Sequence, residues 1–270
     1  MRGYFYKNLP FRTSIFQRKY YLDFSAKSKY FLFDKKGIPL VIYKKRKVVF
    51  PVTVINYFIG LLDSNNLSKT DLIKLNIYLN KNIDNENHFI FKHEFDEKNW
   101  GNKSIWYSNL PHAMLFSFLS RLTSNELSNF SYDLEFYFKS IFHNEIYKKG
   151  IFIEYPSINS QPQNGQLFGL FAVVDAYNKK LISKKSLKLH IDKSFILAKG
   201  QITRFGWTMY NSDRLASPFY HFLHINQYRV CKDFDLRFKK LYFTALLATI
   251  WYPLVIIYKI AEKIINYVKS

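Results

Sequence analysis

The residues best suited to catalysis or ligand binding lie in loop-like segments between predicted helices. They are Glu154, Tyr155, Tyr210, Arg214, Tyr220, His221 and His224. A free tyrosine phenol has a pKa near 10, and a neighbouring cation lowers that pKa, so a tyrosine beside an arginine can act as a base. Because the chain has 21 tyrosines, simple packing with the hydroxyl bonded to backbone is the competing interpretation for any one of them.

Metal and thiol chemistry have weaker support. His221 and His224 are three residues apart and would share a helical face, which suits a pair of metal ligands. No third ligand stands nearby in the sequence, so we predict no metal site. Cys231 is the single cysteine, which excludes a disulfide framework and a Cys-rich zinc site, and we expect it to be buried. The sequence has no phosphate loop, dinucleotide fingerprint or nucleophile elbow, and we predict no cofactor.

The elements that must position these side chains are mostly helical. Short strands are expected within residues 30–50, and Pro51 suits the first turn of a helix. Ser68 with Asp71 resembles a helix N-cap. Another strand is expected at residues 89–95. The apolar periodicity predicts further helices near residues 110–122, 127–141, 165–179, 184–198, 216–231 and 234–266.

Consecutive helices joined by short links favour antiparallel hairpins. The predicted fold is therefore mainly α, an α/α toroid or incomplete (α/α) barrel of helical hairpins with a few short N-terminal β-strands. We divide the chain into a basic N-terminal segment at 1–29, an α/α domain at 30–235 and a hydrophobic and basic C-terminal helix at 236–270. In such a fold the loops at 100–112, 152–165 and 204–227 would line a cleft at one end.

The C-terminal segment predicts contact with a membrane. Residues 241–258 carry no charge and are flanked by basic residues, and this length is just sufficient for a transmembrane helix. The alternative is a buried or interfacial helix with an internal Pro253. The following residues are amphipathic and basic, which suits an anionic leaflet. The N-terminus is basic but has no apolar stretch typical of a secretory signal, and with one thiol we expect a cytoplasmic protein, peripheral or C-terminally anchored at the membrane.

The net charge is strongly positive. The 40 Lys and Arg against 20 Asp and Glu give +20, which indicates a polyanionic partner such as nucleic acid, anionic lipid or acidic polysaccharide. The hydrophobic fraction of 48% excludes a disordered chain. Lysines are scattered over many predicted helices and no nucleic-acid-binding module is recognisable, so we predict no nucleic-acid partner.

Three loop motifs, in order, carry a resemblance to a known family. They are IWYS at 105–108, FIEYP at 152–156 with Asn-Gly at 164–165, and SPFYHFLHINQ at 217–227; the segment 34–61 precedes them. Together they resemble the C-terminal helical domain of the D-glucuronyl C5-epimerases, which act on heparan-type polysaccharides. The resemblance covers roughly residues 30–235.

The resemblance implies an isomerase that inverts C5 of a uronic acid within an acidic polymer. It implies that Glu154 and Tyr220 exchange protons on opposite faces of C5, supported by Tyr155 and by Tyr210 as the third family tyrosine. Arg214 would hold the substrate carboxylate as a bidentate fork. The residues that would shape the sugar subsites are Trp106, Tyr107, Asn164, His221, His224 and Gln227.

The chain also departs from the family. The loop between Tyr210 and Tyr220 is shorter, the Tyr210 segment reads YNSDR, and the family's N-terminal β-rich region is absent or reduced to residues 1–50. Two alternatives therefore remain beside the epimerase. One is a uronate polysaccharide lyase, which would share the same enolate. The other is a non-catalytic protein that binds acidic glycan or a membrane-associated protein of polysaccharide assembly.

Overall fold

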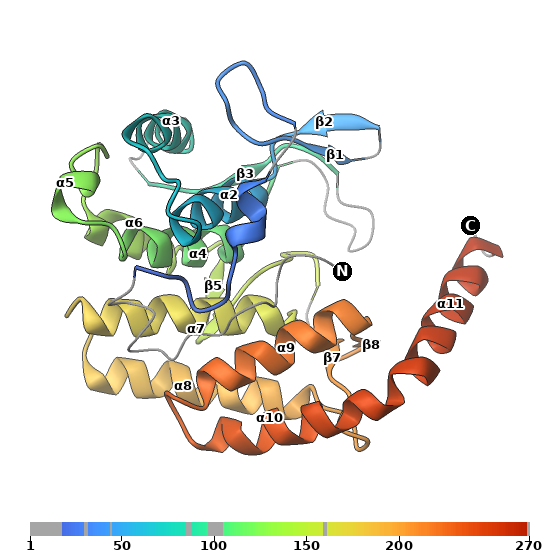
Figure 1. Ribbon diagram of the computed structural model, residues 1–270. Helices are drawn as coiled ribbons and strands as arrows, with labels where there is room; N and C mark the ends of the chain where they lie inside the picture. The colour runs from blue at the N-terminus through green and yellow to red at the C-terminus, as the bar shows by residue number, and fades with distance from the viewer. Residues whose placement is uncertain are drawn as a thin grey trace.

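The computed structural model describes residues 18–29, 32–43, 45–84, 88–96, 105–158 and 161–268. These residues are mainly helical, as the sequence predicts, with a few short strands in small sheets (Figure 1). The strands are not confined to the N-terminal part of the chain, where the sequence predicted them, because strands also occur within 147–152 and 209–215. Most of the predicted N-terminal segment, and residues 100–104 of the first functional loop, lie outside the described residues.

The described strands form four separate antiparallel hairpins. The pairs are β1 (Val41–Tyr43) with β2 (Arg46–Val48), β3 (Lys92–His93) with β4 (Trp106–Tyr107), β5 (Tyr147–Lys148) with β6 (Ile151–Phe152), and β7 (Met209–Asn211) with β8 (Arg214–Leu215). The strand predicted at 89–95 is therefore only two residues long. The first strand predicted within 30–50 falls partly outside the described residues, and Phe33 forms only an isolated bridge with Pro39.

Helices supply most of the fold. Their bounds are α2 (Pro51–Asp63), α3 (Lys69–Asn80), α4 (Asn109–Leu119), α5 (Ser124–Leu127), α6 (Leu134–Ser140), α7 (Gln163–Asn178), α8 (Lys184–Gly200), α9 (Pro218–Cys231), α10 (Arg237–Leu247) and α11 (Tyr252–Val268), with 3₁₀ turns η1 (Ser25–Ser28) and η2 (Ala248–Trp251). Local signals explain several starts. Pro51 occupies the first turn of α2, and Ser68 and Asp71 form a capping box at α3.

Two predicted helices are interrupted. The stretch 127–141 divides into α5 and α6 because Asp133 starts a new helix, accepting a hydrogen bond from the backbone N–H of Phe136 at 2.8 Å. The stretch 234–266 divides at η2. Pro253 lies in the first turn of α11, where its ring and missing N–H prevent a continuous α-helix from α10.

The helix α7 lies at the centre of the packing and is buried from Gln163 to Ala176. It packs against α4, α8 and α9, while α2 packs against α4 and α10 against α9. Close approach to β6 requires Gly169, because a Cβ there would lie 2.1 Å from the Phe152 ring. This arrangement brings the loop after β6 to the N-terminus of α7.

A buried ion pair fixes the described part of the N-terminal segment to this core. Arg121 and Asp175 are fully buried, with Nη1 and Oδ2 2.8 Å apart. The hydroxyl of Tyr21 donates to Asp175 Oδ1 at 2.6 Å, and the Arg121 guanidinium lies over the rings of Tyr20 and Tyr21. The segment that contains Tyr20 and Tyr21 therefore belongs to the core of the helical body.

The C-terminal segment continues from the helical body (Figure 1). α10 packs on α8 and α9, and α11 contacts α9. Within the described residues, Arg237–Ile265 is long and apolar enough to cross a membrane by length and composition alone.

Candidate functional site

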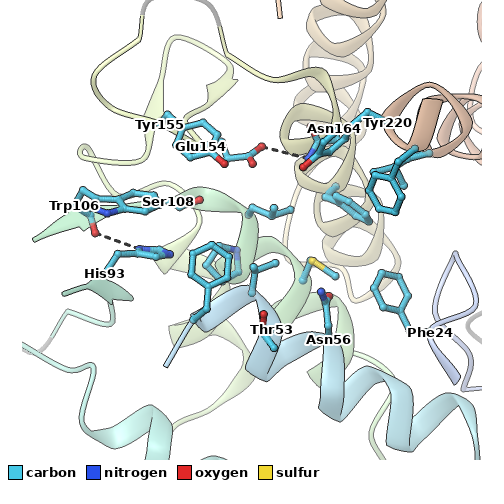
Figure 2. A pocket seen from close by; sticks show the side chains of 18 residues that line it. Phe24, Thr53, Asn56, His93, Trp106, Ser108, Glu154, Tyr155, Asn164 and Tyr220 are labelled. Carbon is cyan, nitrogen blue, oxygen red and sulfur yellow. Dashed lines mark hydrogen bonds between the residues drawn. The ribbon is translucent and has the colours of Figure 1, made fainter. Parts of the chain in front are cut away.

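Two adjacent cavities bring together side chains from segments far apart in the sequence. The first has a volume of about 190 Å³ and is lined by residues of α2, α4, α7 and α9 and of the loops around them (Figure 2). The second, of about 300 Å³, is lined by Tyr155, Tyr210, Arg214, Leu215, Ser217, Tyr220, Lys259 and Glu262. Since Tyr155 and Tyr220 line both, the two cavities share one wall.

Glu154 is held by its backbone at the start of the loop that follows β6. The side-chain oxygen of Gln161 accepts hydrogen bonds from the backbone N–H groups of Glu154 at 2.8 Å and Tyr155 at 3.1 Å. The amide nitrogen of Gln161 donates to the carbonyls of Tyr155 and Ile158. This one buried side chain therefore fixes the turn that directs Glu154 and Tyr155 to the cavities.

The Glu154 carboxyl group reaches the N-terminal turn of α7 and lines the first cavity (Figure 2). Asn164 Nδ2 donates to Glu154 Oε2 at 3.4 Å. A Cβ at position 165 would lie 2.6 Å from the same oxygen, so Gly165 is the residue that admits the carboxyl group. The Asn-Gly motif of the sequence thus supplies a hydrogen-bond donor, Asn164, and the space for the Glu154 carboxyl group at Gly165.

Burial dominates the electrostatics of Glu154. It raises the pKa of the carboxyl group to about 8, against the opposing effect of hydrogen bonds with Tyr155, Asn164 and Tyr210. At neutral pH the group therefore holds a proton. Burial and the nearby Glu154 raise the pKa of Tyr210 well above its ordinary value, so Tyr210 stays a neutral phenol. A tyrosinate base at this position is accordingly disfavoured.

Tyr220 lies in the first turn of α9 on the shared wall. Pro218 begins that helix, and the Ser217 hydroxyl accepts a hydrogen bond from the Tyr220 backbone N–H at 3.4 Å. The half-buried Tyr220 ring meets the Tyr210 ring edge to face, with centroids 4.5 Å apart. Arg214 is exposed in β8 and lines the second cavity beside both tyrosines.

Of the two residues predicted from the IWYS motif to bind sugar, Trp106 lines a cavity and Tyr107 does not. Trp106 lines the first cavity, where its ring stacks on His93 at 3.9 Å and lies 5.7 Å from the Tyr155 ring. Its indole N–H donates to the carbonyl of Phe95 at 3.0 Å, which fixes the ring. Tyr107 pairs with Lys92 in the β3–β4 hairpin and does not line either of the two cavities.

His221, His224 and Gln227 are buried behind the cavity wall rather than in it. The Nδ1 atoms of both histidines lie 3.0 Å from the Thr208 hydroxyl. Burial lowers the pKa of His221 to about 4 and that of His224 to about 3, so both rings are neutral. Gln227 donates to the carbonyl of Asn164 at 3.1 Å. In this geometry these residues position α7, β7 and α9.

The described residues contain no group of three or more His, Cys, Asp and Glu side chains that could hold a metal ion. Cys231 is buried, and burial raises the pKa of its thiol. The residues that line the two cavities offer carboxyl, phenol and amide groups and the cations Arg214 and Lys259.

The structure also adds residues that sequence reasoning missed. Asn56 lines the first cavity, and its side-chain oxygen, like that of Asn164, is buried with no hydrogen-bond partner among the described residues. An unpaired buried acceptor is costly, and a hydroxyl in the cavity could supply the donor. The sequence signal that could have identified Asn56 is that it is the single Asn within the apolar α2.

Lys259 and Glu262 reach the second cavity from α11, and no local sequence signal indicated this.

No family model matches this chain, and no curated protein matches it. The loop motifs and the geometry of the two cavities are therefore the features that bear on function.

Proposed function

We propose that the chain is a polysaccharide uronate C5-epimerase, an isomerase of the D-glucuronate to L-iduronate type. The observation that carries the proposal is a buried carboxyl group, Glu154, with a raised pKa, in the wall of a cavity that Tyr220 also lines. Perturbed acids in cavities are candidates for proton transfer. The resemblance of the three loop motifs supports the same reaction.

The proposed reaction is two-sided proton transfer. The Glu154 carboxylate removes the C5 proton, and the electron pair of the C–H bond moves into the substrate carboxylate to give an enolate dianion. The Tyr220 hydroxyl then donates its proton to the opposite face of C5, which inverts the centre and leaves a phenolate. The proton on Glu154 and the charge on Tyr220 reset through solvent. Tyr155 and Tyr210 support Glu154 by hydrogen bonds.

The developing negative charge needs cations and donors nearby. Arg214 and Lys259 line the second cavity. This cavity shares the wall formed by Tyr155 and Tyr220 with the first cavity. We infer that the uronate carboxylate points towards these cations while C5 lies between Glu154 and Tyr220. Trp106 offers a ring face for the sugar in the first cavity, and Asn56 and Asn164 offer amide groups.

This chemistry has an expected pH dependence. The pair needs Glu154 ionised while Tyr220 keeps its proton. Because burial raises the pKa of Glu154 to about 8, the exchange rate should rise about tenfold for each pH unit below about pH 8 and then level off.

The test is solvent exchange at C5. A polymer of the heparan type that contains unsulfated glucuronate should gain deuterium at C5 when it is incubated with the protein in deuterated water. Tyr220→Phe should lower inversion of glucuronate to iduronate at least about a hundredfold, because Tyr220 supplies the proton on the opposite face of C5. Tyr177→Phe, at the exposed C-terminal end of α7, is the matched control and should leave exchange and inversion unchanged.

Two outcomes would reject the proposal, and a third would reject the role of Tyr220. Absence of deuterium with the polymer bound would favour the alternative of a non-catalytic acidic-glycan-binding protein. An ultraviolet-absorbing unsaturated product would favour a lyase. Inversion that persists in Tyr220→Phe would remove Tyr220 from the mechanism.

We also infer a finer architecture and a location. The helical hairpins are proposed to form an incomplete α/α toroid, supported by the central packing of α7 against α4, α8 and α9 and by cavities where their connecting loops meet. We place the protein in the cytoplasm, in contact with a membrane through the C-terminal segment, supported by the apolar Arg237–Ile265 helix.

A further inference from the structure

The C-terminal segment has two different faces. Its inner face packs on the body through Phe238, Leu241, Ala245, Ala248 and Val255, all of them buried. These positions recur every three or four residues, except across the start of α11, which is the spacing of one helical face. Further along the same face, Lys259 and Glu262 form an ion pair at 2.7 Å and line the second cavity.

The outer face is apolar and exposed. Leu247, Ile250, Leu254, Ile257 and Ile264 repeat at helical spacing, and each is more than half exposed. Between Leu241 and Tyr258 the chain carries no charged side chain. A continuous exposed apolar stripe of this length is unusual for a soluble surface and indicates an interaction site.

A second element joins the stripe at the bend between α10 and α11. Phe205, from the loop after α8, is 59% exposed, and its ring lies 6.2 Å from that of Trp251. The Arg204 guanidinium lies over the Phe205 ring at 4.6 Å. Aromatic and basic side chains that meet in this way suit the polar boundary of a bilayer.

Basic residues bracket the stripe. Lys239 and Lys240 precede it on α10, and Lys263 stands near its far end on α11; all three are exposed. Exposed lysines beside an apolar stripe are complementary to an anionic lipid surface.

The inner face decides how such a helix can meet the membrane. A spanning helix would have to leave α8 and α9 and withdraw Lys259 and Glu262 from the second cavity. It would also have to cross with the uncharged stretch 241–258, which is at the lower limit of length and is interrupted by η2. A helix that lies in the plane of the interface buries one face only and keeps the other on the protein. The observed division of the segment into a packed face and an apolar face matches the second arrangement.

We propose that the outer face of α10, η2 and α11, with Phe205, binds the surface of an anionic bilayer and lies in its plane. The proposal rests on the membrane contact inferred above and adds its orientation. Since the second cavity lies against the inner face of α11, the cleft is held about one helix diameter, roughly 10 Å, from the lipid. A substrate attached to the same membrane would reach it directly.

The experiment is cosedimentation of the full chain with vesicles of phosphatidylcholine that contain about one third phosphatidylglycerol. The chain should bind these vesicles and bind pure phosphatidylcholine more weakly. The double variant Ile250→Asp with Ile257→Asp should weaken binding at least about tenfold. The control is Ile77→Asp with Ile196→Asp, which removes comparably exposed side chains from α3 and α8 and should bind as the wild type does.

Washing at alkaline pH should release the bound protein. Failure of the wild type to bind vesicles, or equal losses in both double variants, would overturn the proposal. Protein that resists the alkaline wash would point instead to a spanning helix. A dimer in solution that the Ile250→Asp and Ile257→Asp variant dissociates, without vesicle binding, would assign the stripe to a second copy. C5 exchange on a soluble polymer is measured without vesicles, so its outcome tests the reaction separately.

Discussion

Replacing Glu154 with Gln should remove a pH-dependent penalty on folding. Burial raises the pKa of the folded-state carboxyl group from its ordinary 4.5 to about 8. Between these values the unfolded chain releases the proton while the folded chain keeps it. Stability therefore falls as pH rises through this window, because the folded state binds more protons than the unfolded state. Gln has a similar shape and does not titrate.

The magnitude follows from the size of the window. Each pH unit between the unfolded and folded pKa values costs the wild type about 1.4 kcal/mol relative to the variant. From about pH 5.5 to about pH 7.5 the difference in unfolding free energy should shift by about 3 kcal/mol in favour of Glu154→Gln. Above about pH 8 the folded group ionises as well, and the difference should stop growing.

Urea unfolding of both proteins at these two pH values measures the shift. Other titrating groups cancel because they are common to both, including Asp63, whose pKa burial raises to about 6. Glu135→Gln is the control, since Glu135 is an exposed carboxylate paired with Lys139 on α6. A difference between wild type and Glu154→Gln that is the same at both pH values would refute the raised pKa.

Three further changes probe separate parts of the structure. Gly165→Ala places a Cβ 2.6 Å from Glu154 Oε2, so C5 exchange should fall about ten- to hundredfold while far-ultraviolet circular dichroism is unchanged; full exchange would contradict the geometry. Asp175→Asn leaves the fully buried Arg121 charge unpaired and should cost about 3–5 kcal/mol in urea unfolding; a cost well under 1 kcal/mol would mean that the ion pair is not buried as described. Lys259→Met removes a cation from the second cavity and should weaken binding of a uronate polymer about threefold or more at low salt; unchanged affinity would exclude Lys259 from the site.

Local signals predicted the helix starts well. Pro51 and the Ser68–Asp71 box mark α2 and α3 because capping depends on neighbours in sequence. The single helix expected at 127–141 is wrong. Asp133 caps a new helix within it, and the apolar periodicity used for the prediction does not register such a cap. The strand expected at 89–95 is short because its ladder depends on residues Trp106 and Tyr107, and such distant pairing is set by tertiary structure.

The candidate site residues also fall into those that local sequence patterns predicted and those that depend on tertiary packing. The sequence singled out Glu154 and Tyr220 because each stands in a recognisable loop motif, and in the structure both line one cavity. Lys259 and Asn56 were missed because their positions depend on how α11 and α2 pack, which no local pattern encodes. His221 shows the reverse case, since helical spacing singled it out but burial places it behind the wall.

The energetics of Glu154 support the proposed proton chemistry rather than a role in stability. A glutamine at this position could accept the same hydrogen bonds from Asn164 and the tyrosines without the cost of a proton that the folded state will not release at pH 7. The surroundings admit the carboxyl group but bury it, since Gly165 lets it lie against the start of α7 and burial raises its pKa. Structures that carry such a penalty locally usually do so where function requires it. A carboxyl group whose pKa lies near the working pH is also the form that proton transfer needs. The same burial that weakens the fold thus gives Glu154 a pKa suited to the proposed proton transfer, and both effects should disappear together in Glu154→Gln.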